Sequence, residues 1–220
     1  MARILVINPN SSVAVTQGMD ESLNVFRTVG GPEILSQCLL DAPIGIETQR
    51  DIDSVVLPLS QKIATEKADA YVIACFSDPG LALARETTDS LVLGVAESAY
   101  FTAVGLGRRF GVLSIGEGSI PRHARYIQSL GLTNWLAGDL SIKSHVADLT
   151  DFERSIDRIG AVGLRLRDEK QADVLILGCV GMSPYRAELE RQTGLPVLDP
   201  TQAAVARAIS LMALGCKPSF

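Results

Sequence analysis

The sequence predicts an α/β protein with two pseudo-symmetric lobes, each a mostly parallel sheet flanked by helices. Short apolar runs rich in β-branched residues alternate along the chain with longer segments of helical periodicity. The second half of the sequence also resembles the first half, in the same order. Because ligands of open α/β sheets bind beyond the carboxyl ends of the strands, the active site is expected in the cleft between the lobes.

Short apolar segments supply the predicted strands. Continuous runs such as Tyr71–Ala74 and Val174–Leu177 are typical of parallel strands that are covered on both faces. The predicted strands are Arg3–Ile7, Glu33–Leu39, Ala70–Ala74, Leu91–Gly94, Phe110–Ser114, Asp139–His145, Val174–Gly178 and Val197–Leu198. The helices between them are predicted at Ser12–Val29, Ile52–Glu66, Pro79–Thr87, Glu97–Gly107, Pro121–Leu130, Asp151–Lys170, Pro184–Thr193 and Thr201–Gly215.

The internal repeat consists of three matching pairs of segments in one order. They are Arg3–Val6 with Phe110–Leu113, Ala68–Cys75 with Ala172–Cys179, and Leu93–Val95 with Leu195–Val197. One pair alone could reflect the general similarity of apolar strands, but three ordered pairs favour a duplication. The repeat predicts a first lobe over residues 1–105 and a second lobe over residues 106–220, with the C-terminal helix able to pack back on the first lobe.

The composition excludes several classes of function. Of the 220 residues, 47% are hydrophobic and 20% are charged, which is ordinary for a globular protein. The formal net charge is −5 and the basic residues are scattered, so the clustered positive face that nucleic acids or anionic membranes require is not expected. The N-terminal apolar run is too short for a signal peptide, and no run approaches transmembrane length. A cytoplasmic protein with a small-molecule substrate is therefore expected.

The cysteines Cys38, Cys75, Cys179 and Cys216 lack paired C-x-x-C spacing, so free thiols are expected. A metal site is not expected, because neither His123 nor His145 has a second ligand at helical spacing. His123 is predicted to lie on the surface, and His145 to end a strand without a partner. Cys38 and Cys216 are interpreted as structural or incidental.

Cys75 and Cys179 close equivalent strands of the repeat. Asp78 and Ser183, each followed by a proline, are predicted to cap the next helix, so both thiols would precede a helix N-terminus. The free N–H groups and positive dipole there would lower a thiol pKa and stabilise an enolate or carboxylate. The pseudo-symmetry would make the two thiols face each other across the cleft.

Two facing thiols suit one class of reaction. A racemase removes a proton from one face of a carbon and returns a proton to the other face, so it needs an acid and a base whose roles exchange. A single cysteine at a strand end is more often a core residue. Two cysteines at matched positions favour the acid/base pair.

Other loops offer polar groups at the same edge of the sheets. Asn10 and Ser11 follow the first strand and could bind a carbonyl or carboxylate, or could only cap a helix. The glycines between Ser114 and Ser119 could let backbone N–H groups reach an anion. Glu47 could orient a group at the cleft or be a solvated surface residue.

The ordered motifs resemble those of the aspartate/glutamate/hydantoin racemase superfamily, and the hydantoin racemase branch is the most similar. The motifs are Asn8-Pro9-Asn10-Ser11, Ala74-Cys75-Phe76-Ser77-Asp78-Pro79-Gly80-Leu81 and Leu177-Gly178-Cys179-Val180-Gly181-Met182. The resemblance implies catalysis by Cys75 and Cys179 without cofactor or metal, in a homo-oligomer. It implies substrate binding by loops that contain Asn10, Ser11, Phe76, Ser77, Asp78, Ser114, Gly118, Ser119, Gly181 and Met182.

Departures from the glutamate-specific pattern indicate the substrate. Relatives that racemise free glutamate tend to carry Asn-Thr after the first cysteine and Thr-His after the second, where this chain has Phe76-Ser77 and Val180-Gly181. These residues favour a ring or a bulky neutral group. The predicted function is therefore racemisation or epimerisation of a 5-substituted hydantoin or allantoin-like ring. The alternatives are a racemase of a free acidic amino acid such as aspartate, a maleate-type cis–trans isomerase with one nucleophilic cysteine, and a non-catalytic small-molecule binding protein.

Overall fold

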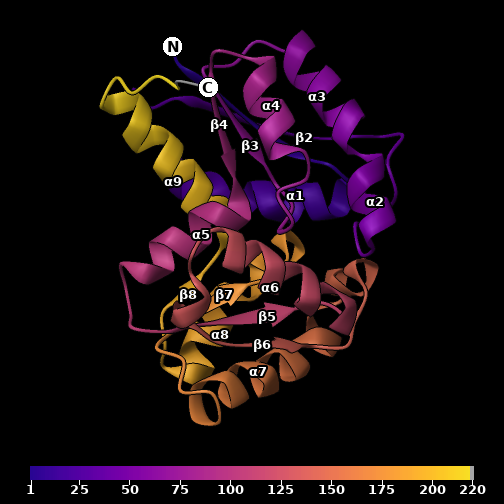
Figure 1. Cartoon of the computed structure of the whole chain (residues 1–220), viewed down its shortest axis with the longest axis vertical. Coiled ribbons are helices and arrows are strands. Elements are labelled where there is room, and N and C mark those ends of the chain that lie inside the picture. The colour runs from indigo at the N-terminus through magenta and orange to yellow at the C-terminus, as the bar shows by residue number, and fades with distance from the viewer. Residues whose placement is uncertain (219–220) are drawn as a thin grey trace.

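A computed structural model of the chain, which describes residues 1–218, contains two four-stranded parallel sheets (Figure 1). The first sheet has the order β2-β1-β3-β4 and the second has the equivalent order β6-β5-β7-β8. Their strands are β1 (Arg3–Asn8), β2 (Glu33–Cys38), β3 (Ala70–Ile73), β4 (Leu91–Gly94), β5 (Phe110–Ser114), β6 (Leu136–Ser141), β7 (Val174–Leu177) and β8 (Val197–Leu198). The predicted fold class, two similar α/β lobes, is confirmed.

Helices connect the strands and cover both faces of each sheet. They are α1 (Val13–Ser22), α2 (Gln49–Ser54), α3 (Val56–Thr65), α4 (Leu81–Thr87), α5 (Val95–Val104), α6 (Ile120–Ser129), α7 (Phe152–Asp168), α8 (Arg186–Thr193) and α9 (Pro200–Ala213). Several boundaries were predicted wrongly, for example those of one strand and one helix. The strand expected at Asp139–His145 begins at Leu136, where it pairs with β5, and the helix expected to reach Val29 ends at Ser22. Within residues 1–218, no helix is both long and apolar enough to cross a membrane.

Alternate residues of the buried strands point to opposite faces, and each face is covered by a different pair of helices. In the first sheet, α3 and α4 cover the face that carries Leu5, Ile7 and Ile73, while α1 and α9 cover the other face. In the second sheet, α7 and α8 cover the face of Leu175 and Leu177, while α5 and α6 cover the other. The two central strands of each sheet, β1 and β3 in the first and β5 and β7 in the second, are thus buried on both faces.

Helices α5 and α9 are exchanged between the lobes. Helix α5 follows β4 of the first sheet, but its Ala99 and Tyr100 belong to the apolar core of Phe110 and Ile176 in the second sheet. Helix α9 follows β8 of the second sheet, but its Ala204 packs in the core of the first sheet. The two helices contact each other at the boundary of the lobes (Figure 1). The division of the chain at residue 105 stays a prediction.

Candidate active site

A cavity of about 210 Å³ lies between the lobes, at the carboxyl ends of β1, β3, β5 and β7. Cys75 follows β3 of the first sheet and Cys179 follows β7 of the second sheet, and both residues line this cavity. The remaining walls come from loops after β1, β2, β5 and β6, through residues such as Asn10, Glu47 and Ser119. The structure therefore brings two cysteines from equivalent strands into one pocket.

Burial dominates the acidity of both thiols. The pKa of Cys75 is raised to about 12, chiefly by burial and to a smaller extent by the nearby Cys179 and Asp78, while the N–H of Ser77 and the charge of Arg122 act against the rise. Burial likewise raises the pKa of Cys179 to about 11, although its sulfur accepts a hydrogen bond from Gly181 N at 3.4 Å. The predicted lowering of these pKa values is wrong, because the loss of hydration outweighs the backbone donors.

The helix caps predicted beside the cysteines are also wrong. Helix α4 begins at Leu81 after Gly80, and α8 begins at Arg186, so neither helix starts at the predicted proline. Asp78 instead accepts hydrogen bonds from Ala96 N and Glu97 N, both at 2.9 Å, and thereby caps α5. Its backbone is left-handed, with φ of 42°. Burial raises the pKa of Asp78 to about 7.

The predicted substrate-binding residues divide into two groups. Those that line the cavity are Asn10, Phe76, Ser77, Gly118 and Ser119. Those that do not line it are Ser11, Asp78, Ser114, Gly181 and Met182. Gly181 still contacts the site, because its N–H donates a hydrogen bond to the Cys179 sulfur. Met182 is buried in the core of the second sheet. Contacts of the first group with a substrate stay predictions.

A buried polar cluster stands behind the second-lobe wall of the cavity. His123 of α6 contacts Asp139 of β6 through Nδ1 and Oδ2 at 2.8 Å, and its Nδ1 also lies 3.0 Å from the hydroxyl of Ser114. His123 is 3% exposed and lines the cavity, so its prediction as a surface residue is wrong. Its position four residues before the buried Ile127, on the apolar face of α6, is the sequence signal that could have revealed this.

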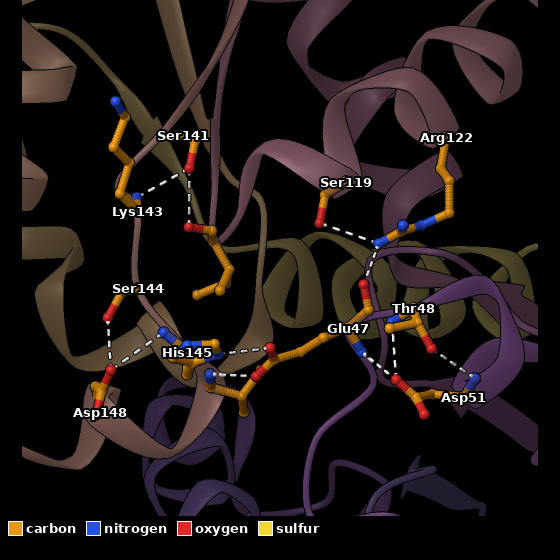
Figure 2. Close-up of polar contacts among 12 residues, drawn as sticks. Glu47, Thr48, Asp51, Ser119, Arg122, Ser141, Lys143, Ser144, His145 and Asp148 are labelled. Carbon is orange, nitrogen blue, oxygen red and sulfur yellow. Dashed lines mark hydrogen bonds and ion pairs between the residues drawn. The ribbon is translucent and has the colours of Figure 1, made fainter.

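A second polar network bridges the two lobes over the cavity, and Figure 2 shows it. We name it the Glu47 bridge. Glu47, from the loop before α2, contacts His145 Nδ1 at 2.8 Å and accepts a hydrogen bond from Val146 N at 2.9 Å. Its carbonyl oxygen accepts a hydrogen bond from Arg122 Nη2 at 2.6 Å. Asp51 holds the same loop by accepting hydrogen bonds from the N–H groups of Glu47 and Thr48.

The Glu47 bridge bears on the expectations for Glu47 and His145. Glu47 lines the cavity, which agrees with the first of the two alternatives left open for this residue. His145 lies beyond the end of β6 and has a carboxylate partner, so the prediction that it ends a strand without a partner is wrong. The hydrogen bond that His145 donates to Glu47 raises the pKa of His145, and the Glu47 carboxylate also raises the pKa of Cys179.

Known proteins with similar sequences and structures identify the family. A model of the Asp/Glu/Hydantoin racemase family matches residues 4–208. The chain belongs to this family. It is 33% identical to a hydantoin racemase of Pseudomonas sp. (strain NS671), over 99% of this chain and 88% of the relative. It is 35% identical to a hydantoin racemase of Paenarthrobacter aurescens, over 99% of this chain and 94% of the relative.

A solved structure supports the same assignment. Allantoin racemase from Klebsiella pneumoniae matches with a TM-score of 0.95 and 29% sequence identity, over 100% of this chain and 91% of that chain. The protein is therefore an isomerase of the racemase type, as the sequence motifs predicted. Over residues 1–218, the racemase shows no cluster of three or more metal-ligating side chains. The ionisable groups that line its cavity are two thiols, two imidazoles and the Glu47 carboxylate.

Proposed function

We propose that this racemase interconverts the enantiomers of a 5-substituted hydantoin or allantoin-like ring by proton transfer through Cys75 and Cys179. The observation that carries the proposal is the shared cavity, which both cysteines line from opposite lobes. The names of the relatives, hydantoin racemase and allantoin racemase, support the class of substrate. The cavity volume of about 210 Å³ suits a small ring.

The chemistry requires one thiolate and one thiol. The thiolate removes the hydrogen from the ring carbon beside the carbonyl, and the electron pair of the broken C–H bond moves onto the carbonyl oxygen as an enolate. The other thiol then delivers its proton to the opposite face of the same carbon. The two sulfurs exchange their protonation states in each turnover, so either enantiomer can be the starting material. Because each state needs both groups, the pair titrates as a coupled system.

The charges of the cavity favour a neutral ring over a free acidic amino acid. Cationic side chains make the strongest hydrogen bonds to the carboxylates of a dicarboxylic substrate. Among the described residues that line the cavity there is no Lys or Arg, and the Glu47 carboxylate would repel such a substrate. A cyclic ureide carries no charge and offers N–H and C=O groups that the polar walls can bind.

The experiment follows the circular dichroism of enantiopure 5-substituted hydantoins, allantoin, aspartate and glutamate in the presence of the enzyme, in water and in heavy water. We expect the signal of at least one hydantoin or of allantoin to decay, with deuterium entering at the stereocentre. Loss of signal only with free aspartate or glutamate would show that the substrate class is wrong. Isomerisation of maleate without deuterium at a stereocentre would favour the one-thiol alternative. Reactions without enzyme correct for spontaneous racemisation.

A further inference from the structure

In the buried cluster of His123, Asp139 and Ser114, His123 lines the cavity, but the cluster has no part in the two-thiol scheme. The side chains of His123 and Asp139 are each 4% exposed. The hydroxyl of Ser114, which is fully buried, donates to Asp139 Oδ1. Apolar residues of similar size often replace buried ion pairs without loss of stability. A histidine–carboxylate pair kept beside a reaction cavity therefore indicates a functional requirement.

The hydrogen bonds of the cluster fix the tautomer of His123. An ionised carboxylate only accepts hydrogen bonds, so the contact between Asp139 Oδ2 and His123 Nδ1 requires a hydrogen on Nδ1. Ser114 gives its one hydroxyl hydrogen to Asp139, and its oxygen is then an acceptor for the same Nδ1 hydrogen. In the neutral imidazole, Nε2 therefore carries a lone pair.

The Nε2 edge of the ring makes no hydrogen bond within the described chain. His123 lines the reaction cavity and also an adjoining hollow, and the two share Phe76 and Ser77. The ring of Phe76 lies edge-to-face against the imidazole, with centroids 5.1 Å apart. All the hydrogen bonds of the His123 imidazole within the described chain are made by Nδ1, on the side of β5 and β6. Nε2 has no hydrogen-bond partner there, yet it is not among the buried unpaired atoms, so it is open to a ligand.

We propose that His123 is a substrate-binding residue of this racemase and that its Nε2 accepts a hydrogen bond from an N–H group of the ring. Asp139 and Ser114 are positioning residues, because they hold the imidazole and keep the hydrogen on Nδ1. The bond would fix the rotation of the ring in the cavity, so that the reacting carbon lies between the two sulfurs. The inference rests on the proposed function, because it concerns a ring substrate with N–H groups.

The test combines a variant of the protein with a change in the substrate. His123→Asn is the main variant, because its amide nitrogen can take the place of Nδ1 and keep Asp139 paired, while nothing replaces Nε2. The substrates are a 5-substituted hydantoin that the wild type racemises and its N1-methyl and N3-methyl derivatives. Glu97→Gln is the matched control, since it alters a different buried polar pair, Arg85–Glu97, that does not line the cavity. Unfolding temperatures of all variants verify that they fold.

We expect the wild type to prefer the parent ring over one of the two N-methyl derivatives. In His123→Asn, kcat/KM for the parent ring should fall by about tenfold to hundredfold, because a buried N–H loses its acceptor. The value for the discriminated N-methyl derivative should stay nearly constant, so the preference disappears. In Asp139→Asn, the amide can donate to Nδ1 and shift the ring hydrogen to Nε2, so the preference should also shrink. Glu97→Gln should keep it.

Two failures are distinguishable. If the wild type racemises neither hydantoins nor allantoin, the proposed function is wrong. If the wild type racemises them and folded His123→Asn keeps the full preference for the parent ring over both N-methyl derivatives, the role of His123 is wrong and the two-thiol proposal stands. A full preference in Asp139→Asn, with its loss in His123→Asn, would overturn only the assignment of the tautomer to Asp139. Should His123→Asn not fold, His123→Ala, which also removes Nε2, offers the same comparison of substrates.

Discussion

The loops after β3 and β7 carry equivalent cysteines, but they differ in the charges around them. Cys75 interacts with Asp78 of its own loop and with Arg122 of α6. Cys179 instead interacts with Glu47, which comes from the other lobe. The two cysteines therefore occupy equivalent positions in their sheets, but different charged groups surround them. The two thiols of a pseudo-symmetric site need not be chemically equivalent.

The backbone of the two loops differs as well. The chain after Cys75 turns through left-handed residues at Asp78 and Gly80 before α4 begins. The chain after Cys179 enters a 3₁₀ turn at once, over Val180–Tyr185, and the Cys179 sulfur accepts the N–H of Gly181. The first loop thus uses a carboxylate to cap a distant helix, whereas the second uses its cysteine to cap its own turn.

The largest effect is expected when either catalytic thiol is removed, because the reaction can then use only one face of the substrate. For Cys75→Ser and Cys179→Ser we expect kcat for racemisation to fall by about 10³-fold or more, because each variant lacks one acid/base group. Each variant should still exchange the hydrogen of one enantiomer with solvent, since one thiolate can remove and return a proton on its own face. The two variants should act on opposite enantiomers. Proton NMR of both enantiomers in heavy water measures this exchange.

The exchange experiment needs a control variant, and one of its outcomes would contradict the prediction. Cys38→Ser serves as control, because Cys38 lies at the end of β2 and does not line the cavity. It should racemise and exchange like the wild type. If Cys75→Ser and Cys179→Ser exchange the same enantiomer, the two sulfurs do not act on opposite faces.

The pH dependence of the reaction should reveal the burial of both thiols. The pKa of Cys75 is raised to about 12 and that of Cys179 to about 11, so the folded protein favours the neutral thiols. Below these values the fraction with one thiolate, and with it kcat/KM, should rise about tenfold per pH unit from neutral pH upward. By linkage, the same shifts should lower the free energy of unfolding as the pH rises above the ordinary thiol pKa. Initial rates by circular dichroism measure the profile.

A plateau of kcat/KM near pH 7 would contradict this prediction, because it would place one thiolate at an ordinary or lowered pKa. Ultraviolet thiolate absorbance gives an independent titration. The Cys75→Ser/Cys179→Ser double variant supplies its baseline, since Cys38 and Cys216 are also free thiols.

The smallest expected effect is a change in the reactivity of Cys179 when the charge of the neighbouring Glu47 is removed. Glu47→Gln removes the carboxylate that raises the pKa of Cys179, while the amide oxygen can still accept the N–H of Val146. Alkylation of Cys179 by iodoacetamide at pH 8 should become a few-fold faster, because more thiolate is present. Alkylation of Cys75 should change less. Peptide mass spectrometry follows both sites.

Glu117→Gln is the matched control for this charge change, because Glu117 pairs with Lys143 at an exposed position outside the cavity lining. Equal acceleration at Cys75 and Cys179 in Glu47→Gln would indicate general opening of the Glu47 bridge and not a local charge effect.

The sequence predicted the fold well because strand patterns are local. Runs such as Val174–Leu177 show their burial directly, and the repeat then implies two equivalent sheets. The edge strand β6 was misplaced because all of its residues are only partly buried, so its pattern is weak. The motifs also located the two cysteines, whose equivalence follows from the same repeat.

The rest of the site depends on contacts between distant residues, which local patterns do not record. His123 and Asp139 are 16 positions apart, and Glu47 and His145 are 98 apart. The pKa values were predicted in the wrong direction for a related reason. A strand end followed by a turn indicates backbone N–H donors, but the cost of burying a thiolate depends on the walls that other elements supply.

The exchange of α5 and α9 has a consequence for how this protein could be divided. A fragment that ended near residue 105 would keep α5 without the second sheet that α5 covers, and its own sheet would lack α9. The complementary fragment would expose apolar surface in the same reciprocal way. Each half of the chain therefore supplies a helix that buries the sheet of the other half, so we expect that neither half folds as a separate fragment.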